Sequence, residues 1–300
     1  MKKVLVIAGP TASGKSSFSI EIAHILKTEI ISGDSIQVYR GEDIGSGKIK
    51  EEEKEGVQHH LLDILNPNEQ YTVKTFQEMA RKIINELETI PIIVGGTGLY
   101  LKSCLYDYEF LEEEGPSIEE SLEIYSNMEL YQKLLEVDPL QAEKIHPNNR
   151  RRLLRSLTIA LRSGKPQSEQ IAKQKHEPIY DIFIAGCTMP REVLYEKINQ
   201  RVHQMMEDGL EKEVQTLLEK GYTFDDPGLR GIGYQEWKEY FAKNRTKEEV
   251  EKEIAKHSRN YAKRQYTWLK HQMPVKWFDV LDQEEHQKMI EEIILWAKND

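Results

Sequence analysis

The chain has 300 residues, with 41 lysines and arginines against 51 aspartates and glutamates, so its formal net charge is −10. That balance excludes a uniformly cationic nucleic-acid coat, but not a local basic surface on an acidic body. Cys104 and Cys187 are the only cysteines and form no C-x-x-C pair, which argues against a disulfide framework and against a thiolate zinc site. No apolar run approaches the roughly 18 residues that a membrane helix needs. We expect a cytoplasmic monomer without a membrane partner.

Short apolar segments alternate with helical patterns along much of the chain. Continuous apolar runs predict four buried strands, at residues 4–8, 29–33, 92–94 and 181–186. Between the first two, residues 17–26 place four apolar side chains on one helical stripe: Phe18, Ile22, Ile25 and Leu26. Strands that alternate with helices predict an α/β fold, a mostly parallel sheet flanked by helices.

Three glutamates followed by Gly115 and Pro116 interrupt this alternation. From there to about residue 173 the pattern is helical, and Leu153, Leu157 and Leu161 recur at a spacing of four. We therefore expect an all-helical insertion domain at residues 112–173, within a core domain formed by residues 1–111 and 174–300. The pattern after residue 191 is mainly amphipathic helix, interrupted by a turn-rich stretch at residues 225–233.

A glycine-rich loop follows the first predicted strand and matches the P-loop pattern G-x-x-x-x-G-K-[ST]. Its residues are Gly9, Pro10, Thr11, Ala12, Ser13, Gly14, Lys15 and Ser16. Glycines let successive N–H groups point into one concavity, and the following helix adds its positive end, so a diphosphate fits. Lys15 would contact the outer phosphates, and Ser16 would bind Mg²⁺. Because a strand precedes the loop and a helix follows it, we prefer a P-loop NTPase-like core to an ordinary glycine turn.

Asp34 is the only acidic candidate at the carboxyl end of a predicted strand. A nucleotide hydrolase normally carries an aspartate at such a position, but the third strand continues into Gly95-Gly96-Thr97 and the fourth into Gly186-Cys187. Ligands of open α/β sheets bind outside the carboxyl ends of the strands. The P-loop, Asp34 and Thr97 should therefore converge, and we favour a functional role for Asp34 over a solvated turn aspartate.

Two acid-free stretches concentrate positive charge. The first contains Lys144, Arg150, Arg151, Arg152, Arg155, Arg162 and Lys165; the second contains Lys256, Arg259, Lys263, Arg264 and Lys270, with Tyr261, Tyr266 and Trp268 interleaved. Arg151, Arg155 and Arg162 fall close to one helical face, opposite the leucines. Cations would neutralise phosphates, and aromatic rings could stack on unpaired bases. For either stretch alone, a solvated helix face with its aromatics in the core is an equal alternative.

A set of ordered motifs resembles the bacterial tRNA dimethylallyltransferases, also called tRNA isopentenyltransferases. The motifs lie at residues 9–16, 33–39 (Gly-Asp-Ser, then Gln-Val-Tyr), 59–63 (His-His-Leu-Leu-Asp), 95–100 (Gly-Gly-Thr-Gly-Leu-Tyr), 146–149 (His-Pro-Asn-Asn), 230–234 (Arg-Gly-Ile-Gly-Tyr) and 263–268 (Lys-Arg-Gln-Tyr-Thr-Trp). The P-loop alone is generic, whereas the whole set is specific.

This resemblance implies transfer of a dimethylallyl group from dimethylallyl diphosphate to the exocyclic N6 amine of the adenosine immediately 3′ of the anticodon in tRNA. Asp34 matches the family's general base, and Thr97 matches the hydroxyl that positions the amine. Arg201 matches an arginine that contacts the diphosphate, although its sequence context alone favours an exposed helix arginine. The resemblance also implies that the helical insertion and the carboxy-terminal motif bind the anticodon stem-loop, as they do in members of the family. We expect tRNA contacts from Asp34, Ser35, Ile36, Gln37, Arg151, Arg152, Arg155, Arg230, Gly233, Tyr234, Lys263, Arg264, Gln265 and Trp268.

Three other functions fit parts of the pattern. A small-molecule or nucleotide kinase would use the same P-loop on ATP, but it gives no reason for two basic helices. An adenine-nucleotide prenyltransferase needs no insertion that grips RNA. A non-enzymatic RNA-binding switch is disfavoured because the chain has no guanine-reading N-K-x-D motif.

Overall fold

The computed structural model describes residues 1–110 and 118–299 and divides the chain into two compact units. Unit 1 comprises Met1–Leu105 and Pro178–Asp300, and unit 2 comprises Tyr106–Glu177. The insertion was expected at residues 112–173. The second unit starts six residues earlier, at Tyr106, and ends four residues later, at Glu177. The Glu-Gly-Pro interruption on which the first bound rested lies outside the described residues.

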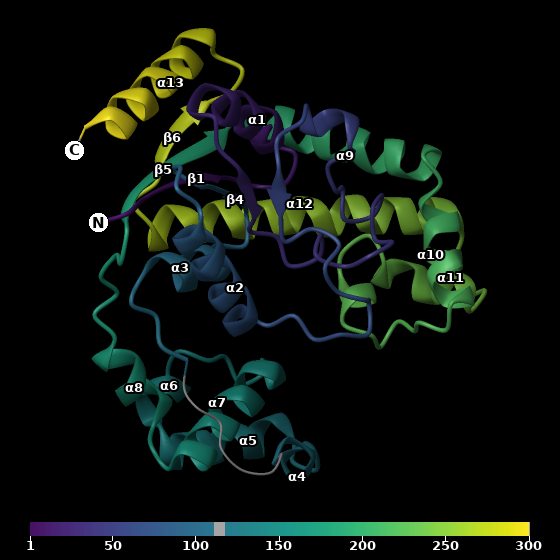
Figure 1. Cartoon of the computed structure of the whole chain (residues 1–300). Coiled ribbons are helices and arrows are strands. Elements are labelled where there is room, and N and C mark those ends of the chain that lie inside the picture. Colours follow the sequence, from purple (N-terminus) through teal and green to yellow (C-terminus); the bar gives the residue numbers. More distant parts are fainter. Residues whose placement is uncertain (111–117, 300) are drawn as a thin grey trace. The chain divides into compact units, whose positions relative to one another are not determined.

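Unit 1 is built on a parallel six-stranded sheet with the order β3-β2-β4-β1-β5-β6 (Figure 1). The strands are β1 (Lys3–Ala8), β2 (Ile30–Ser32), β3 (His59–His60), β4 (Ile92–Gly95), β5 (Asp181–Thr188) and β6 (Lys276–Asp279). The predicted α/β class and the four predicted strands are confirmed. The two edge strands, β3 and β6, were not predicted; β6 lies in the stretch after residue 191 that was expected to be mainly helix.

Helices cover both faces of this sheet. Figure 1 shows α1 (Lys15–Leu26) and α13 (Gln283–Lys298) on one side, with α2 (Val73–Glu86), α3 (Gly98–Leu105) and α12 (Lys247–Gln272) on the other. Leu5 and Ile7 of β1 share a buried cluster with Phe18, Ile22 and Ile293. Ile25 is 43% exposed, so the stripe predicted for the first helix does not extend to it. The cluster fixes α1, the helix that follows the P-loop, against the central strands.

A second buried cluster supports the remainder of unit 1. It joins α9 (Arg191–Glu207), α10 (Leu210–Glu219) and the start of α12 to the turn-rich stretch, through Val202, Val214, Tyr234, Trp237 and Val250. The short helices of this unit are η1 (Glu52–Lys54), η2 (Gly228–Arg230), η3 (Gln235–Trp237) and α11 (Lys238–Phe241). The predicted turn-rich interruption is thus a packed element that anchors α9 and α10.

The described part of unit 2 is helical. Its helices are α4 (Glu119–Glu123), α5 (Asn127–Val137), α6 (Pro139–Ala142), α7 (Arg150–Ser163) and α8 (Gln167–Lys173). Leu130 and Leu134 of α5 pack against Leu153 and Leu157 of α7. Leu161 is 51% exposed, so the predicted leucine stripe ends one turn early. Asn149 caps α7, because its side chain accepts the N–H of Arg152.

No helix in residues 1–110 or 118–299 is long and apolar enough to span a bilayer.

Candidate active site

The central feature of the site is the meeting of three loops at the carboxyl ends of the neighbouring strands β2, β4 and β1. Glycines allow this approach: a Cβ on Gly95 would lie 2.5 Å from the carbonyl oxygen of Gly33, and one on Gly96 would lie 2.7 Å from that of Gly9. Since Asp34 follows β2, the structure brings Asp34, the P-loop and the Gly95–Gly98 loop to one edge of the sheet, where ligands of open α/β sheets bind.

The P-loop leads into the N-terminus of α1 without any side chain occupying it. Gly14 takes the N-cap position at φ +84°, and it has no side chain that could accept the N–H groups of the first turn. The first turn of α1 contains no acidic residue. The Ser13 hydroxyl is buried, with no hydrogen-bond partner among the described residues. Uncapped N–H groups at a helix start attract anions, so this concavity is suited to phosphate oxygens.

Lys15 lies over this loop, and its ammonium donates to the carbonyl oxygen of Pro10 at 2.5 Å. Burial lowers the pKa of Lys15 to about 8; nearby Cys187 and Asp34 act in the opposite direction, whereas Arg201 adds to the lowering. The charge of this side chain in the ligand-free protein therefore changes close to neutral pH. A bound phosphate would favour the charged form.

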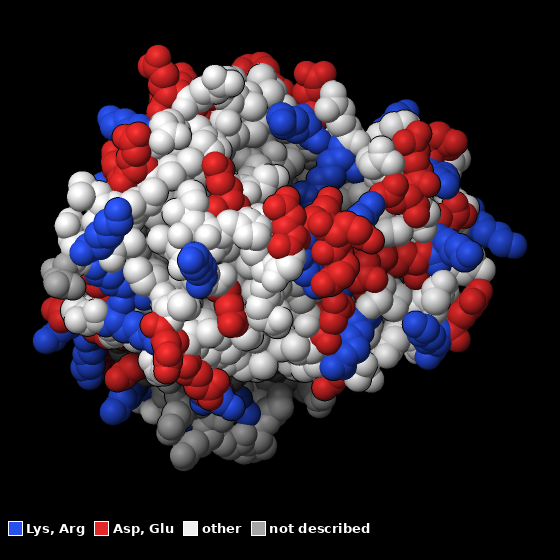
Figure 2. All heavy atoms as spheres, turned by 45° about the horizontal axis from the view of Figure 1, so that its top comes forward, with Lys and Arg blue, Asp and Glu red and all other residues white. Residues whose placement is uncertain are grey.

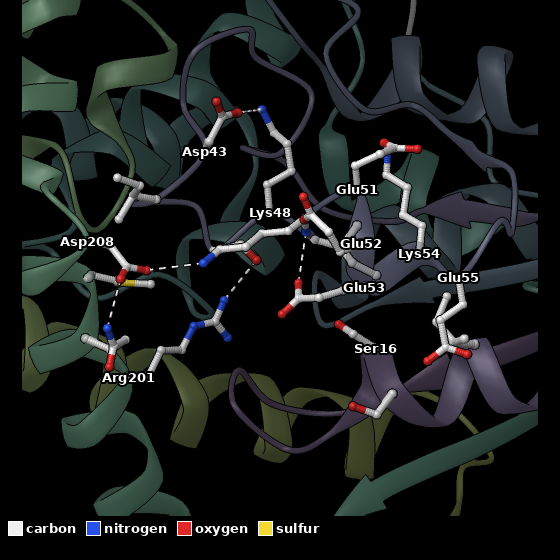
Figure 3. Close-up of a pocket in the computed structure, with 18 of the residues that line it drawn as sticks. Ser16, Asp43, Lys48, Glu51, Glu52, Glu53, Lys54, Glu55, Arg201 and Asp208 are labelled. Carbon is white, nitrogen blue, oxygen red and sulfur yellow. Dashed lines mark hydrogen bonds and ion pairs between the residues drawn. The ribbon is translucent and has the colours of Figure 1, made fainter.

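Arg201 of α9 forms part of the wall of a cavity of about 1280 Å³ that also contains Ser16. Figure 3 shows the side chains of Arg201 and Ser16 at this cavity. The guanidinium Nη2 of Arg201 donates to the carbonyl oxygen of Gly47 at 3.0 Å. Burial lowers the pKa of Arg201, opposed by Asp34 and Glu53. In Figure 2 acidic and basic side chains surround a hollow on this face. Sequence context alone favoured an exposed helix arginine, but Arg201 lies in the cavity wall and is bonded to Gly47.

Asp34 has a fixed orientation, because its Oδ1 accepts the N–H groups of Ile36 at 2.8 Å and Gln37 at 3.3 Å. Within the described residues its Oδ2 makes no hydrogen bond. After burial, which is the largest cause in each case, the Asp34 charge raises the pKa values of Lys15, Arg201 and Tyr261. The Asp34 charge is thus felt both by the cations near the P-loop and by Tyr261.

One face of α12 closes the site. Gln265 Oε1 accepts the N–H of Thr11 at 2.9 Å, and the Tyr261 hydroxyl lies 3.4 Å from Thr97 Oγ1. The Trp268 indole packs so closely on Gly98 that a Cβ there would lie 1.9 Å from Trp268 Cε3. The helix therefore fixes both the P-loop and the loop that carries Thr97.

Comparison with known proteins places the chain in a family. A family model described as IPP transferase matches residues 37–272. The tRNA dimethylallyltransferase of Anoxybacillus flavithermus is 47% identical over 297 residues, covering 98% of this chain and 95% of its own. The chain belongs to the IPP transferase family. A second relative of the same name, from Bacillus cytotoxicus, is 46% identical over 96% of this chain and 94% of its own.

Solved structures agree with this membership. The tRNA delta(2)-isopentenylpyrophosphate transferase of Staphylococcus epidermidis matches with a TM-score of 0.73 and 40% identity, covering 98% of each chain. A eukaryotic dimethylallyltransferase described as acting on tRNA matches with a TM-score of 0.84 and 29% identity, over 98% of this chain and 80% of that one. The resemblance drawn from the motifs is confirmed, as is the expectation of a transferase with a P-loop-like fold.

Three residues of this IPP transferase that were expected to contact RNA are buried. Gly233 and Tyr234 lie inside unit 1, and Gln265 is only 7% exposed. The Tyr234 hydroxyl donates to Glu213 at 2.8 Å and accepts the N–H of Ser46 at 3.1 Å. Tyr234 and Gln265 are therefore engaged within the protein in this structure, and the RNA contacts expected of all three residues stay predictions. Their positions indicate that they support the loops of the site.

Gln37 and Ile36 are also engaged within the protein. The Gln37 amide donates to the carbonyl oxygen of Gly47 at 3.3 Å, and Ile36 packs against Gly231. The Ser35 side chain is partly exposed beside them.

The remaining basic candidates lie at the surface. Exposed side chains are those of Arg151, Arg152, Arg155, Arg230, Lys263 and Arg264. Arg150, in the same acid-free stretch, instead donates to the carbonyl oxygens of Tyr125 and Glu123, which ties α7 to the chain before α5. The RNA contacts of the exposed cations stay predictions.

Sequence reasoning missed two residues of this site. Tyr261 was noted only as a possible stacking ring, and Glu213 was not noted at all. A helical glutamate among other acidic residues carries no distinguishing pattern, so its contacts could be found only in three dimensions.

Proposed function

We propose that this protein transfers the dimethylallyl group of dimethylallyl diphosphate to the N6 amine of the adenosine immediately 3′ of the anticodon in tRNA, releasing diphosphate. The observation that supports it most is the joining of a phosphate cradle and a fixed carboxylate at the ends of adjacent strands. The names of the relatives agree with this reaction.

The bond changes assign a task to each side of the crevice. The bond between the allylic carbon and the diphosphate oxygen breaks, and its electron pair leaves with diphosphate. A bond forms between that carbon and N6, and the N6 proton passes to a base. One side must therefore stabilise developing negative charge, while the other accepts a proton.

The phosphate side is formed by the P-loop N–H groups, the Ser13 hydroxyl, Lys15 and Arg201. Preorganised donors directed at developing charge lower the barrier, because they need no reorganisation during the reaction. The allylic carbon tolerates positive charge, so stabilisation of the leaving diphosphate should supply much of the rate.

Magnesium fits this side as a partner of the diphosphate. Mg²⁺ usually keeps several waters and binds few protein groups beside substrate phosphates, and the described residues contain no cluster of three His, Cys, Asp or Glu side chains suited to a metal. The exposed Ser16 hydroxyl at the start of α1 would hold the ion together with phosphate oxygens. When bound, Mg²⁺ neutralises charge on the diphosphate.

Asp34 is the proposed base. The adenine amine is a weak nucleophile because its lone pair is delocalised into the ring, so removal of its proton as the bond forms helps the reaction. Two backbone N–H groups hold Asp34 Oδ1, which leaves Oδ2 to accept the proton. The Thr97 hydroxyl would orient the amine.

The proposed RNA partner is the anticodon stem-loop. An unpaired loop base can be extruded at small cost, and exposed cations on α7 and α12 would neutralise the flanking phosphates. Trp268 and Ser35 would lie near the entering base. The cytoplasmic, monomeric state stays a prediction.

Incubation with allyl-labelled dimethylallyl diphosphate and Mg²⁺ tests the proposal. We expect label in unmodified tRNA, none in a transcript with guanosine 3′ of the anticodon, and labelling slowed at least about 100-fold with the Asp34→Asn variant. Label in free AMP but not in tRNA would support nucleotide prenylation. Transfer of the γ-phosphate of ATP, with no allyl transfer, would support a kinase.

A further inference from the structure

The carboxylate of Glu213, on α10, is surrounded by donors from a distant loop. Its Oε2 accepts the N–H groups of Asp43 at 3.0 Å and Ile44 at 2.8 Å, and its Oε1 accepts that of Gly45 at 3.1 Å. The Tyr234 hydroxyl donates to Oε1 as well, at 2.8 Å. Consecutive N–H groups around one anion form a nest, and here the anion belongs to the protein.

The loop held in this way carries the backbone group that contacts Arg201. The carbonyl oxygen of Gly47 accepts Arg201 Nη2 at 3.0 Å and Gln37 Nε2 at 3.3 Å. A Cβ on Gly47 would lie 1.5 Å from Arg201 Nη2, so the guanidinium rests directly on the loop backbone. A shift of this loop therefore shifts the guanidinium.

Other contacts also hold the loop, but only Glu213 accepts the successive N–H groups of residues 43–45 among the bonds of the described residues. The Lys48 ammonium donates to Asp43 at 2.6 Å, to Asp63 at 2.5 Å and to the carbonyl oxygen of Tyr39 at 2.8 Å. Figure 3 shows Asp43, Lys48 and Arg201 around the same cavity. Without Glu213, three successive N–H groups would lose their acceptor, and the loop would be held only by its remaining bonds, among them that of the Ser46 N–H to the Tyr234 hydroxyl.

We propose that Glu213 is a positioning residue for diphosphate binding, which acts by holding residues 43–47 so that Arg201 points at the diphosphate of the substrate. This inference rests on the proposed function only for the identity of the substrate. Binding of inorganic diphosphate with Mg²⁺ tests Glu213 directly, whether or not the protein prenylates tRNA.

Isothermal titration calorimetry measures the affinity of the whole 300-residue chain for inorganic diphosphate in the presence of Mg²⁺. We expect Glu213→Gln to weaken binding about tenfold, because an amide offers one acceptor oxygen where the carboxylate offers two. The matched control is Glu211→Gln on the same helix. Glu211 accepts the Tyr240 hydroxyl at 2.6 Å and pairs with Lys247, away from the loop, so diphosphate affinity should stay within twofold.

A double-mutant cycle separates positioning from general stabilisation. In an Arg201→Gln background, Glu213→Gln should change diphosphate affinity less than twofold, because the group through which it acts is gone. An equal loss in both backgrounds, or no loss in the wild-type background, would overturn the proposal.

Tyr234→Phe provides a second variant if Glu213→Gln does not fold. It removes one donor to Glu213 and the acceptor of the Ser46 N–H, so we expect diphosphate binding about threefold weaker, again only when Arg201 is present. With labelled substrate, the KM for dimethylallyl diphosphate should rise while the Kd for tRNA stays unchanged. A change in tRNA affinity of the same size would contradict the assignment.

Discussion

Helices α7 and α12 carry similar charge patterns but have different relations to the catalytic crevice. Both present exposed cations within acid-free stretches, Arg151 and Arg152 on α7 and Lys263 and Arg264 on α12. The inner face of α7 packs into the leucine core of its own unit. The inner face of α12 instead bonds to the P-loop through Gln265.

The difference shows that equal charge patterns can have unequal functional roles. A cation on α7 can contribute to RNA affinity through phosphate neutralisation. A change on α12 can also displace the P-loop and the loop that carries Thr97, which are the proposed diphosphate and amine sites. The following variants test this division, from the largest expected effect to the smallest.

Asp34→Asn should impair the chemical step without impairing tRNA binding. An amide cannot accept the N6 proton, so we expect kcat to fall about 100- to 10,000-fold, while the Kd for tRNA changes less than threefold. Single-turnover transfer and filter binding measure the two quantities. Comparable losses in both would assign Asp34 to binding.

Gln265→Leu tests the inner face of α12. Loss of the acceptor for the Thr11 N–H should lower kcat/KM for dimethylallyl diphosphate about tenfold, with little change in tRNA affinity. Gln272→Leu is the matched control, because Gln272 accepts Lys102 at 3.3 Å near the end of the same helix. If tRNA affinity fell and kcat/KM did not, Gln265 would be an RNA contact after all.

Paired replacements compare the outer faces. Arg151→Ala with Arg152→Ala, and Lys263→Ala with Arg264→Ala, should each weaken tRNA binding about tenfold and reduce the slope of log K against log salt by about 1.4–1.8. Only the α12 pair should also lower kcat, about threefold, because Arg264 lies 5.7 Å over the Tyr261 ring. An unchanged salt slope for the α7 pair would show that this helix does not bind the RNA backbone.

The pH dependence should differ between the two ligands. Burial lowers the pKa of Lys15 to about 8, so its ammonium is present below pH 8 and is lost above it. Affinity for the unreactive thiolo analogue of dimethylallyl diphosphate should therefore fall about fourfold between pH 7 and 8.5. Lys15→Met should bind more weakly at every pH and lose this dependence. Affinity for tRNA should stay constant over the range, because arginines do not titrate there. A parallel decline for tRNA would contradict the assignment to Lys15.

Local patterns predicted the central sheet, but not its edges. Strands β1, β2, β4 and β5 lie in apolar runs. Strand β6 has only four residues, and Lys276 and Asp279 border its two aromatic residues, so no pattern separates it from the flanking helices. Ile25 and Leu161 fit helical stripes but are exposed, because a periodic pattern does not show where the opposing surface ends.

The parts of the site that directly follow a predicted strand could be predicted from residue type and position in the sequence. The P-loop, Asp34 and Thr97 follow strands β1, β2 and β4, and strand order brings them together. Arg201 required the resemblance, because a helical arginine carries no local signal. The burial of Tyr234 and Gln265 could not be read from motifs, since a specific sequence motif does not distinguish a ligand contact from a structural one.

The Gly95–Gly98 loop has a consequence for mutational tolerance. Gly95 lies against Gly33, Gly96 against Gly9 and Gln265, and Gly98 against Trp268, so each of the three glycines is restricted by different neighbours. In a saturation screen, all three positions should score as intolerant as Asp34, although none needs to touch a substrate. Inactivity at such positions reports how closely the loops pack, and only measurements of binding and turnover on purified variants separate it from chemistry.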